Sequence, residues 1–346
     1  MTIRDRKQLK QAAHRRLGAA SYNPNRLVLI HSGVALGAAL LLTVLSYVIS
    51  WQIEINGGGL RGMKLRAVLE TADAFLQLVY SVLSPFWMIG LTYAAVRLAK
   101  GKSAWPQCLL EGFARKGAVL RLLLLQGLIY SIITMAAMVG SYFLYGMTPD
   151  GQAFNTAILR LWMEQGIGSY YELYEAIPEQ VLDQVTRGYM PFFAVVVAVL
   201  IIPATYRLRF APYVLMDKDD SGAKKAIRTS GKITRRNGWQ IFALDLSFWW
   251  YYLVKIVLML PAFASVLLPL LHVELPVDEK MLVLGGNAIY VILTLIFEIQ
   301  AQPKVMTTYA LAYDALLEQY QLENPPTPEE SGRMVDSSGY TVRNEE

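Results

Sequence analysis

Long apolar runs separated by short polar segments dominate the hydrophobicity pattern of this chain. Six runs of 18 to 32 residues contain at most two charged residues each. A helix rising 1.5 Å per residue needs roughly 20 apolar residues to cross a hydrocarbon core of about 30 Å. The runs lack the two-residue alternation of a membrane β-barrel. We therefore predict an all-α integral membrane protein with six transmembrane helices. The predicted spans are residues 27–51, 74–96, 122–146, 189–206, 240–271 and 281–302.

The composition supports this prediction. Hydrophobic residues make up 54% of the 346 residues, and charged residues only 17%, whereas soluble domains have about 25% charged residues. We divide the chain into a basic amphipathic helix (1–26), a six-span membrane domain (27–322) and a disordered polar tail (323–346). The single cysteine, Cys108, excludes an internal disulfide.

The distribution of Lys and Arg predicts the orientation. The segment before the first span and the connections after the second and fourth spans hold 22 of these residues, and the three alternate connections hold 6. Cytoplasmic loops are enriched in Lys and Arg. Both termini are therefore predicted to lie in the cytoplasm.

Each cytoplasmic segment has a basic stretch with apolar residues at helical spacing. We expect short interfacial helices with the apolar side in the acyl chains and the cations toward anionic lipid headgroups. The stretch after the fourth span is the most basic. Its candidate contacts with anionic lipid are Lys224, Lys225, Arg228, Lys232, Arg235 and Arg236.

Thr-Tyr pairs at 92–93, 205–206 and 308–309 end the even-numbered spans. They suggest three repeated hairpin units, although the preference of tyrosine for membrane interfaces explains them equally well. The longest outer connection, 147–188, carries apolar stripes. It is either a pair of amphipathic helices on the outer leaflet or a lid over a central cavity.

Three ionisable residues fall inside the predicted spans, where such groups are functional candidates by default. Asp245 and Glu298 lie near the cytoplasmic ends of their spans, and we expect each to pair with a basic residue such as Arg235 or Lys304. Lys255 lies about 22 Å into its span. It requires backbone carbonyls and hydroxyls, a water-filled cavity or a path to the outer face.

No pattern in the sequence predicts catalysis, a cofactor or a metal. His14, His31 and His272 fall at different depths or sides of the predicted membrane. The acidic stretch that begins at Asp217 resembles the start of a calcium loop, but its twelfth position is Arg228 where a glutamate is required. Nucleotide-binding and hydrolase motifs are missing. We therefore expect no enzymatic activity, no catalytic residue, no cofactor and no metal site.

The third cytoplasmic segment and the ends of the flanking spans carry a family resemblance. The motifs are YRLRFAPYVLMD (206–217), KAIRTS (225–230), GWQIFALDLSFW (238–249) and TYALAYDAL (308–316). They resemble the bacterial multi-span family catalogued as domain of unknown function 975, most strongly over about 200–317. The resemblance implies a bacterial plasma-membrane protein without an assigned activity, and it transfers no catalytic residue.

Three functional classes remain open at this point. We expect a non-enzymatic membrane protein, a lipid-interacting scaffold or a regulatory or accessory subunit. Its partners would be anionic lipid headgroups and another membrane protein, and not nucleic acid. The alternative is a transporter or channel with a polar path near Lys255, Asp245 and Glu298. A membrane enzyme acting on lipid is the third class.

Overall fold

The computed structural model of this protein describes Ile3 and residues 5–56, 59–165, 185–217, 222–263 and 279–325. About 90% of it is helical, without a strand in these ranges, which confirms the all-α prediction. The chain divides into two compact units, which are described separately. The first unit comprises Met1–Leu120 and Phe210–Glu346, and the second comprises Arg121–Arg209.

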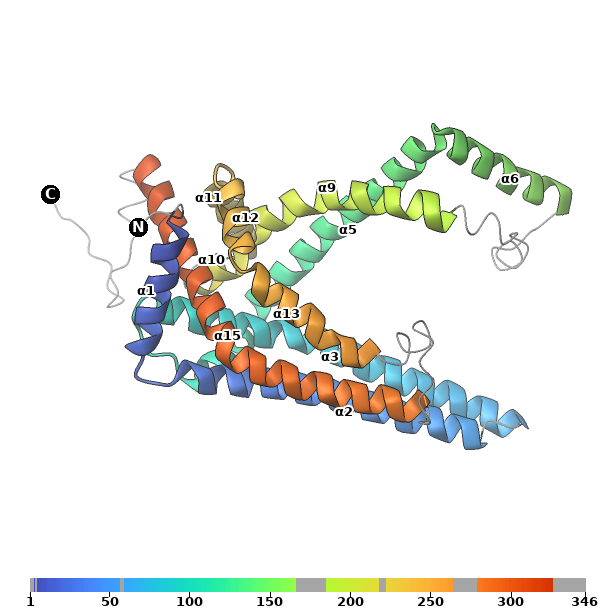
Figure 1. Ribbon diagram of the computed structural model, residues 1–346, viewed down its shortest axis with the longest axis horizontal. Coiled ribbons are helices and arrows are strands. Elements are labelled where there is room, and N and C mark those ends of the chain that lie inside the picture. Colours follow the sequence, from blue (N-terminus) through green and yellow to red (C-terminus); the bar gives the residue numbers. More distant parts are fainter. Residues whose placement is uncertain are drawn as a thin grey trace. The chain divides into compact units, whose positions relative to one another are not determined.

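The first unit is built around three long helices, α2, α3 and α15, which lie side by side (Figure 1). Shorter helices pack around them. The helices are α1 (Arg6–Gly18), α2 (Pro24–Asn56), α3 (Gly59–Ala99), α4 (Glu111–Ala114), α10 (Ala211–Asp217), α11 (Ala223–Thr234), α12 (Gly238–Leu246), α13 (Trp249–Met259) and α15 (Glu279–Glu323), with 3₁₀ turns η1 (Pro106–Leu110) and η3 (Leu260–Phe263).

The second unit contains α5 (Lys116–Gly146, which begins in the first unit), α6 (Pro149–Gln165), the π-helix η2 (Val185–Tyr189) and α9 (Met190–Leu208). The Ser141 and Tyr189 hydroxyls lie 3.2 Å apart and join α5 to η2. Helix α6 forms the first part of the predicted outer connection. Residues 166–184 lie outside the described part of the chain, so the choice between a lid and a surface pair stays open.

Five helices are long and apolar enough to span a membrane, and a bent pair brings the number to six if it is one span. The bent pair corresponds to the predicted fifth span, 240–271, where α12 and the α13–η3 segment meet at 55°. The break falls at Ser247, whose hydroxyl donates to the Leu244 carbonyl at 2.6 Å. Such three-residue bonds tighten and end a helical turn. Within 238–263 the predicted fifth span is therefore a bent pair of helices.

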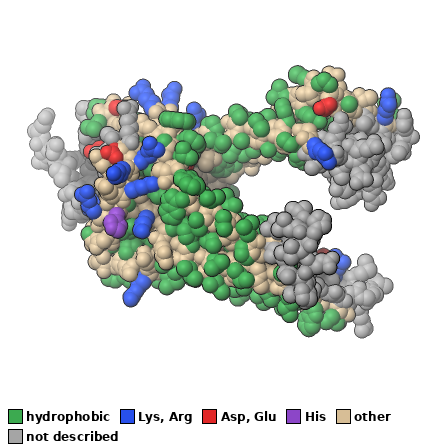
Figure 2. Space-filling view, in the orientation of Figure 1, with side chains coloured by type: hydrophobic (Ala, Val, Ile, Leu, Met, Phe, Trp, Pro, Cys, Tyr) green, Lys and Arg blue, Asp and Glu red, His purple; other side chains and the backbone are tan. Residues whose placement is uncertain are grey.

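The long helices expose apolar side chains over most of their surfaces, as Figure 2 shows for one face of the molecule. Leu124, Met135 and Val195 are among the exposed large side chains. Contiguous apolar surface of this extent marks contact with lipid or protein, and helices satisfy their backbone hydrogen bonds without water. The surface fits a hydrocarbon environment.

Backbone contacts fix the packing at one end of the first unit. A Cβ atom added to Gly90 would lie 2.0 Å from the Leu109 carbonyl oxygen, and one added to Gly112 would lie 2.0 Å from that of Phe86. Helix α3 therefore touches the η1–α4 segment backbone to backbone. Around this contact, Leu27 of α2 and Ala310 of α15 join a buried apolar cluster.

Helix α15 continues well beyond the predicted sixth span, 281–302, to Glu323. Its second half contacts α1 and α11, the two basic helices that we expected to insert into acyl chains. In α1 the buried residues are Leu9 and Ala13. Lys10 donates to the Ser247 carbonyl at 2.7 Å, and burial, together with the charge of Arg6, lowers its pKa. The apolar sides of these helices thus face protein.

Candidate functional site

An ion pair joins α13 to α15 inside the predicted spans. Lys255 Nζ lies 2.8 Å from Glu298 Oε1. The second carboxylate oxygen, Oε2, accepts a 2.7 Å hydrogen bond from Ser32 of α2. Three helices thus place polar groups at one point. The structure pairs Glu298 with Lys255 instead of the expected Arg235 or Lys304, because the bend after α12 redirects α13 along α15.

Two further side chains complete this polar cluster, which we define as His31, Ser32, Lys255, Glu298 and Gln302. Gln302 Oε1 lies 3.2 Å from the Ser32 hydroxyl. His31 is only 6% exposed, and its Nδ1 has no hydrogen-bond partner in the described structure. Its ring stacks on Trp87, which donates its indole N–H to the His31 carbonyl at 3.1 Å.

Asp245 does not join this cluster. Its Oδ1 accepts a 2.5 Å hydrogen bond from Tyr309 Oη, and the Tyr252 hydroxyl lies 3.4 Å from that of Tyr309. Asp245 thus connects α12 to α15 at a separate point. The three predicted intramembrane residues therefore form two sites, one around the Lys255–Glu298 pair and one at Asp245.

Sequence reasoning missed a second ion pair, in which only the carboxylate is buried. Lys100, just after α3, contacts Asp217 of α10, whose side chain is 5% exposed. Tyr313 of α15 donates to Asp217 Oδ2 at 3.1 Å. Asp217 and Tyr313 both belong to the family motifs quoted above, which is the signal that would have found this contact.

The six predicted lipid contacts share one exposed surface, which we call the basic surface. Lys224, Lys225, Arg228, Lys232, Arg235 and Arg236 are all exposed. Figure 2 shows Lys and Arg side chains gathered near α1 and α11. The opposite side of α11 is buried through Ala223, Ala226, Ser230, Ile233 and Thr234. That side packs on α10 and α15, so the expected insertion of α11 into acyl chains is wrong, and only its cations face outward.

Local contacts tie part of this surface to the end of α15. Arg236 lies 3.6 Å from Glu323, and Lys232 lies over the Tyr320 ring at 5.9 Å. Beside the cations, Trp239 is 77% exposed and packs on Phe242 with ring centroids 5.2 Å apart. Tryptophan beside a cluster of cations is typical of a membrane–water interface.

The described residues hold no group of three His, Cys, Asp or Glu side chains that could bind a metal. Cys108 is buried. The absence of enzymatic activity stays a prediction.

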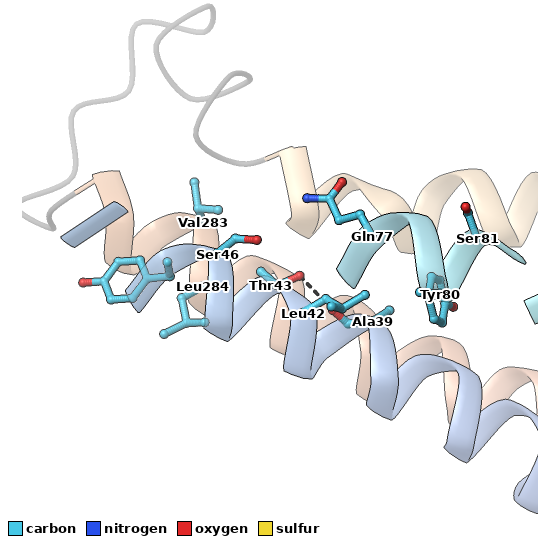
Figure 3. Close-up of a pocket in the computed structure, with 10 residues that line it drawn as sticks. Ala39, Leu42, Thr43, Ser46, Gln77, Tyr80, Ser81, Val283 and Leu284 are labelled. Atoms are coloured by element: carbon cyan, nitrogen blue, oxygen red, sulfur yellow. Dashed lines mark hydrogen bonds between the residues drawn. The ribbon is translucent and has the colours of Figure 1, made fainter. Parts of the chain in front are cut away.

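A pocket of about 850 Å³ opens between α2, α3 and α15 (Figure 3), and Lys255, Glu298 and Asp245 are not among the residues that line it. Sequence reasoning placed a cavity near Lys255 and missed this one. The sequence feature that indicates this pocket is a set of hydroxyl and amide residues at helical spacing on the first two spans. The lining residues are Ala39, Leu42, Thr43, Ser46, Tyr47, Gln77, Tyr80, Ser81, Val283 and Leu284.

Long apolar helices of this number are typical of the multi-span α-helical membrane proteins. Within that class, the chain belongs to the family described as "Protein of unknown function (DUF975)", whose model matches residues 1–319. This confirms the resemblance found in the motifs and extends it over nearly the whole chain. No curated protein and no solved structure matches the chain.

Proposed function

We propose that this protein is a non-enzymatic component of the bacterial plasma membrane that binds anionic lipid headgroups and acts as a scaffold or accessory subunit. The basic surface carries the proposal. Lys224, Lys225, Arg228 and Arg235 are exposed, and no described carboxylate lies within ion-pair distance of them. Each cation near an anionic leaflet contributes about 1 kcal/mol of attraction.

The packing of α11 supports this proposal. Its apolar residues are held by α10 and α15, so the cations sit on a preformed scaffold and the helix does not have to fold as it meets lipid. A preorganised surface loses less entropy on binding than a disordered segment does. Trp239 supplies an interfacial anchor next to the cations.

The same reasoning gives the orientation. Since anionic lipid is concentrated in the cytoplasmic leaflet, we place the basic surface and both termini in the cytoplasm. The excess of Lys and Arg on the same side of the spans supports this placement.

The polar cluster fits a role in holding helices together. Lys255 and Glu298 neutralise each other at 2.8 Å, and Ser32 occupies the second carboxylate oxygen. A paired and hydrogen-bonded charge is the arrangement that makes an ionisable group tolerable in a membrane. The cluster therefore favours a scaffold over a transport path.

The test is lipid selectivity of the full-length protein in nanodiscs that contain phosphatidylglycerol and phosphatidylcholine. The triple variant Lys224→Glu/Lys225→Glu/Arg228→Glu should lose the enrichment of phosphatidylglycerol around the protein, as measured by lipid mass spectrometry after purification. The matched control, Lys224→Arg/Lys225→Arg/Arg228→Lys, retains the charge and should retain the enrichment. Equal enrichment in both variants, or enrichment that does not fall with salt, would refute the proposal.

A further inference from the structure

We propose that the pocket between α2, α3 and α15 is a binding site for one phospholipid with a protonated amine headgroup. This inference is independent of the basic surface and of its proposed function. It rests on the polarity of the pocket, on its depth and on a carboxylate at its rim.

The two ends of the pocket differ in chemistry. Near Ala39 and Leu42, the hydroxyl groups are satisfied by their own helix or by a neighbour. Thr43 donates to the Ala39 carbonyl at 3.0 Å, and Tyr80 donates to the Ala35 carbonyl at 3.2 Å. This part of the pocket therefore favours an apolar ligand group. Figure 3 shows Thr43 bonded to its own helix beside Leu42.

The other end has a carboxylate. Ser46 donates to Asp73 Oδ1 at 2.6 Å, and Gln77 donates to Asp73 Oδ2 at 2.9 Å. Both Ser46 and Gln77 line the pocket, so the Asp73 carboxylate is hydrogen-bonded to two side chains of its rim. A carboxylate has about four acceptor positions, and these bonds occupy two of them. No described Lys or Arg lies within ion-pair distance of Asp73.

The depth of the pocket matches a lipid molecule. Ser46 is about 28 Å along α2 from Leu27, where the first predicted span begins, and Ala39 is about 18 Å along it. In a hydrocarbon core of about 30 Å, the Asp73 end reaches the headgroup level of the leaflet far from the α2 N-terminus. The apolar end points toward the bilayer centre. An acyl chain fits the apolar end of the pocket, and an ammonium group fits the end near Asp73.

The negative charge of Asp73 determines which lipid headgroup the site prefers. A primary ammonium donates to the free positions of Asp73 and neutralises it, whereas a phosphate–glycerol headgroup brings only negative charge. A choline headgroup keeps the positive charge but has no N–H donor. Preference for a primary amine over both alternatives is therefore the signature of this site.

The experiment uses the full-length protein in nanodiscs with lipids that carry a photoactivatable diazirine in one acyl chain. Phosphatidylethanolamine, phosphatidylcholine and phosphatidylglycerol probes are compared, and the labelled peptides are identified by mass spectrometry. We expect phosphatidylethanolamine to label peptides containing Ala39 or Tyr80 roughly five-fold more than the other probes. Excess free ethanolamine should not compete, because it lacks the chain.

Two kinds of variant separate the parts of the proposal. Asp73→Asn should bring the three probes to equal labelling, while Glu70→Gln, one turn away on the exposed surface of α3, should leave the preference unchanged. Ala39→Trp fills the apolar end and should abolish labelling by every probe. If Ala39→Trp does not fold, as judged by the loss of its thermal transition, Ser81→Trp replaces it. This second variant fills the pocket from α3.

Unchanged labelling in a folded Trp variant would overturn the site. An unchanged headgroup preference in Asp73→Asn would overturn the role of the carboxylate. Competition by free ethanolamine would show a small-amine site in place of a lipid site and would also overturn the proposal.

Discussion

Removing one member of the Lys255–Glu298 pair should destabilise the protein far more than the loss of one surface contact. At 2.8 Å and an effective dielectric constant of 20, the attraction of two unit charges is about 6 kcal/mol. The Lys255 side chain is 37% exposed and that of Glu298 11%, so we expect about half of this as net coupling. Leaving either charge alone in the interior is the larger part of the penalty.

The assay is a double-mutant cycle in mixed micelles, with unfolding followed by tryptophan fluorescence. Lys255→Met and Glu298→Gln should each lower the free energy of unfolding by about 2–3 kcal/mol. The double variant should lie about 2 kcal/mol below the parent protein, which gives a coupling of about 2–4 kcal/mol. The control is Arg66→Met with Glu70→Gln, an exposed pair at 2.8 Å, whose coupling should stay below about 0.5 kcal/mol.

Additive effects of the Lys255 and Glu298 substitutions, within about 0.5 kcal/mol, would refute the reasoning. They would mean that each group is satisfied without the other. A coupling equal to that of the Arg66–Glu70 control would do the same, because burial would then contribute nothing.

Three further predictions concern packing, hydrogen bonding and topology. Gly90→Ala should destabilise the protein by about 3 kcal/mol, because its Cβ would meet the backbone of η1 at 2.0 Å; Gly37→Ala, with no atom within 4 Å, should be neutral in the same thermal denaturation. Tyr309→Phe removes the 2.5 Å hydrogen bond to a carboxylate and should cost about 1 kcal/mol of unfolding free energy, and a variant as stable as the parent would contradict this. In a Cys-free background, Arg66→Cys should react with an impermeant maleimide in intact cells and Lys7→Cys only after permeabilisation; the reverse pattern would invert the proposed orientation.

The membrane class and most helix positions follow from sequence because burial in lipid requires long uninterrupted apolar helices. Residues 27–51 and 189–206, for example, fall within or close to α2 and α9. The pattern of apolar runs contains this information, since a backbone in hydrocarbon has few alternatives to the helix. The threefold repeat suggested by the Thr-Tyr pairs stays a prediction.

The partners of the polar residues did not follow from sequence. Lys255 was placed by counting along a straight helix, but the break at Ser247 changes the direction of α13 and brings Lys255 to Glu298. Ser32 lies 266 positions away from Glu298, and no periodicity links residues so distant.

The prediction that the apolar sides of the amphipathic helices face lipid was wrong for a related reason. The periodicity of α11 identifies its apolar side correctly, but an apolar stripe looks the same whether acyl chains or a helix cover it. Helix α10 and the continuation of α15 to Glu323 provide the protein surface against which α11 buries Ala226 and Ile233. A prediction limited to the spans omitted that surface.

The distance in sequence between α2 and α15 has a consequence for biogenesis. Helices α2 and α3 are synthesised more than 170 residues before α15, the helix that they both contact. Until then Ser32 lacks its hydrogen-bond partners Glu298 and Gln302. Long sequence separation slows the formation of such contacts, so the nascent amino-terminal hairpin depends on a chaperone or on its own α2–α3 packing during that interval. Ribosome stalling before residue 279 would trap this intermediate and expose it to membrane proteases.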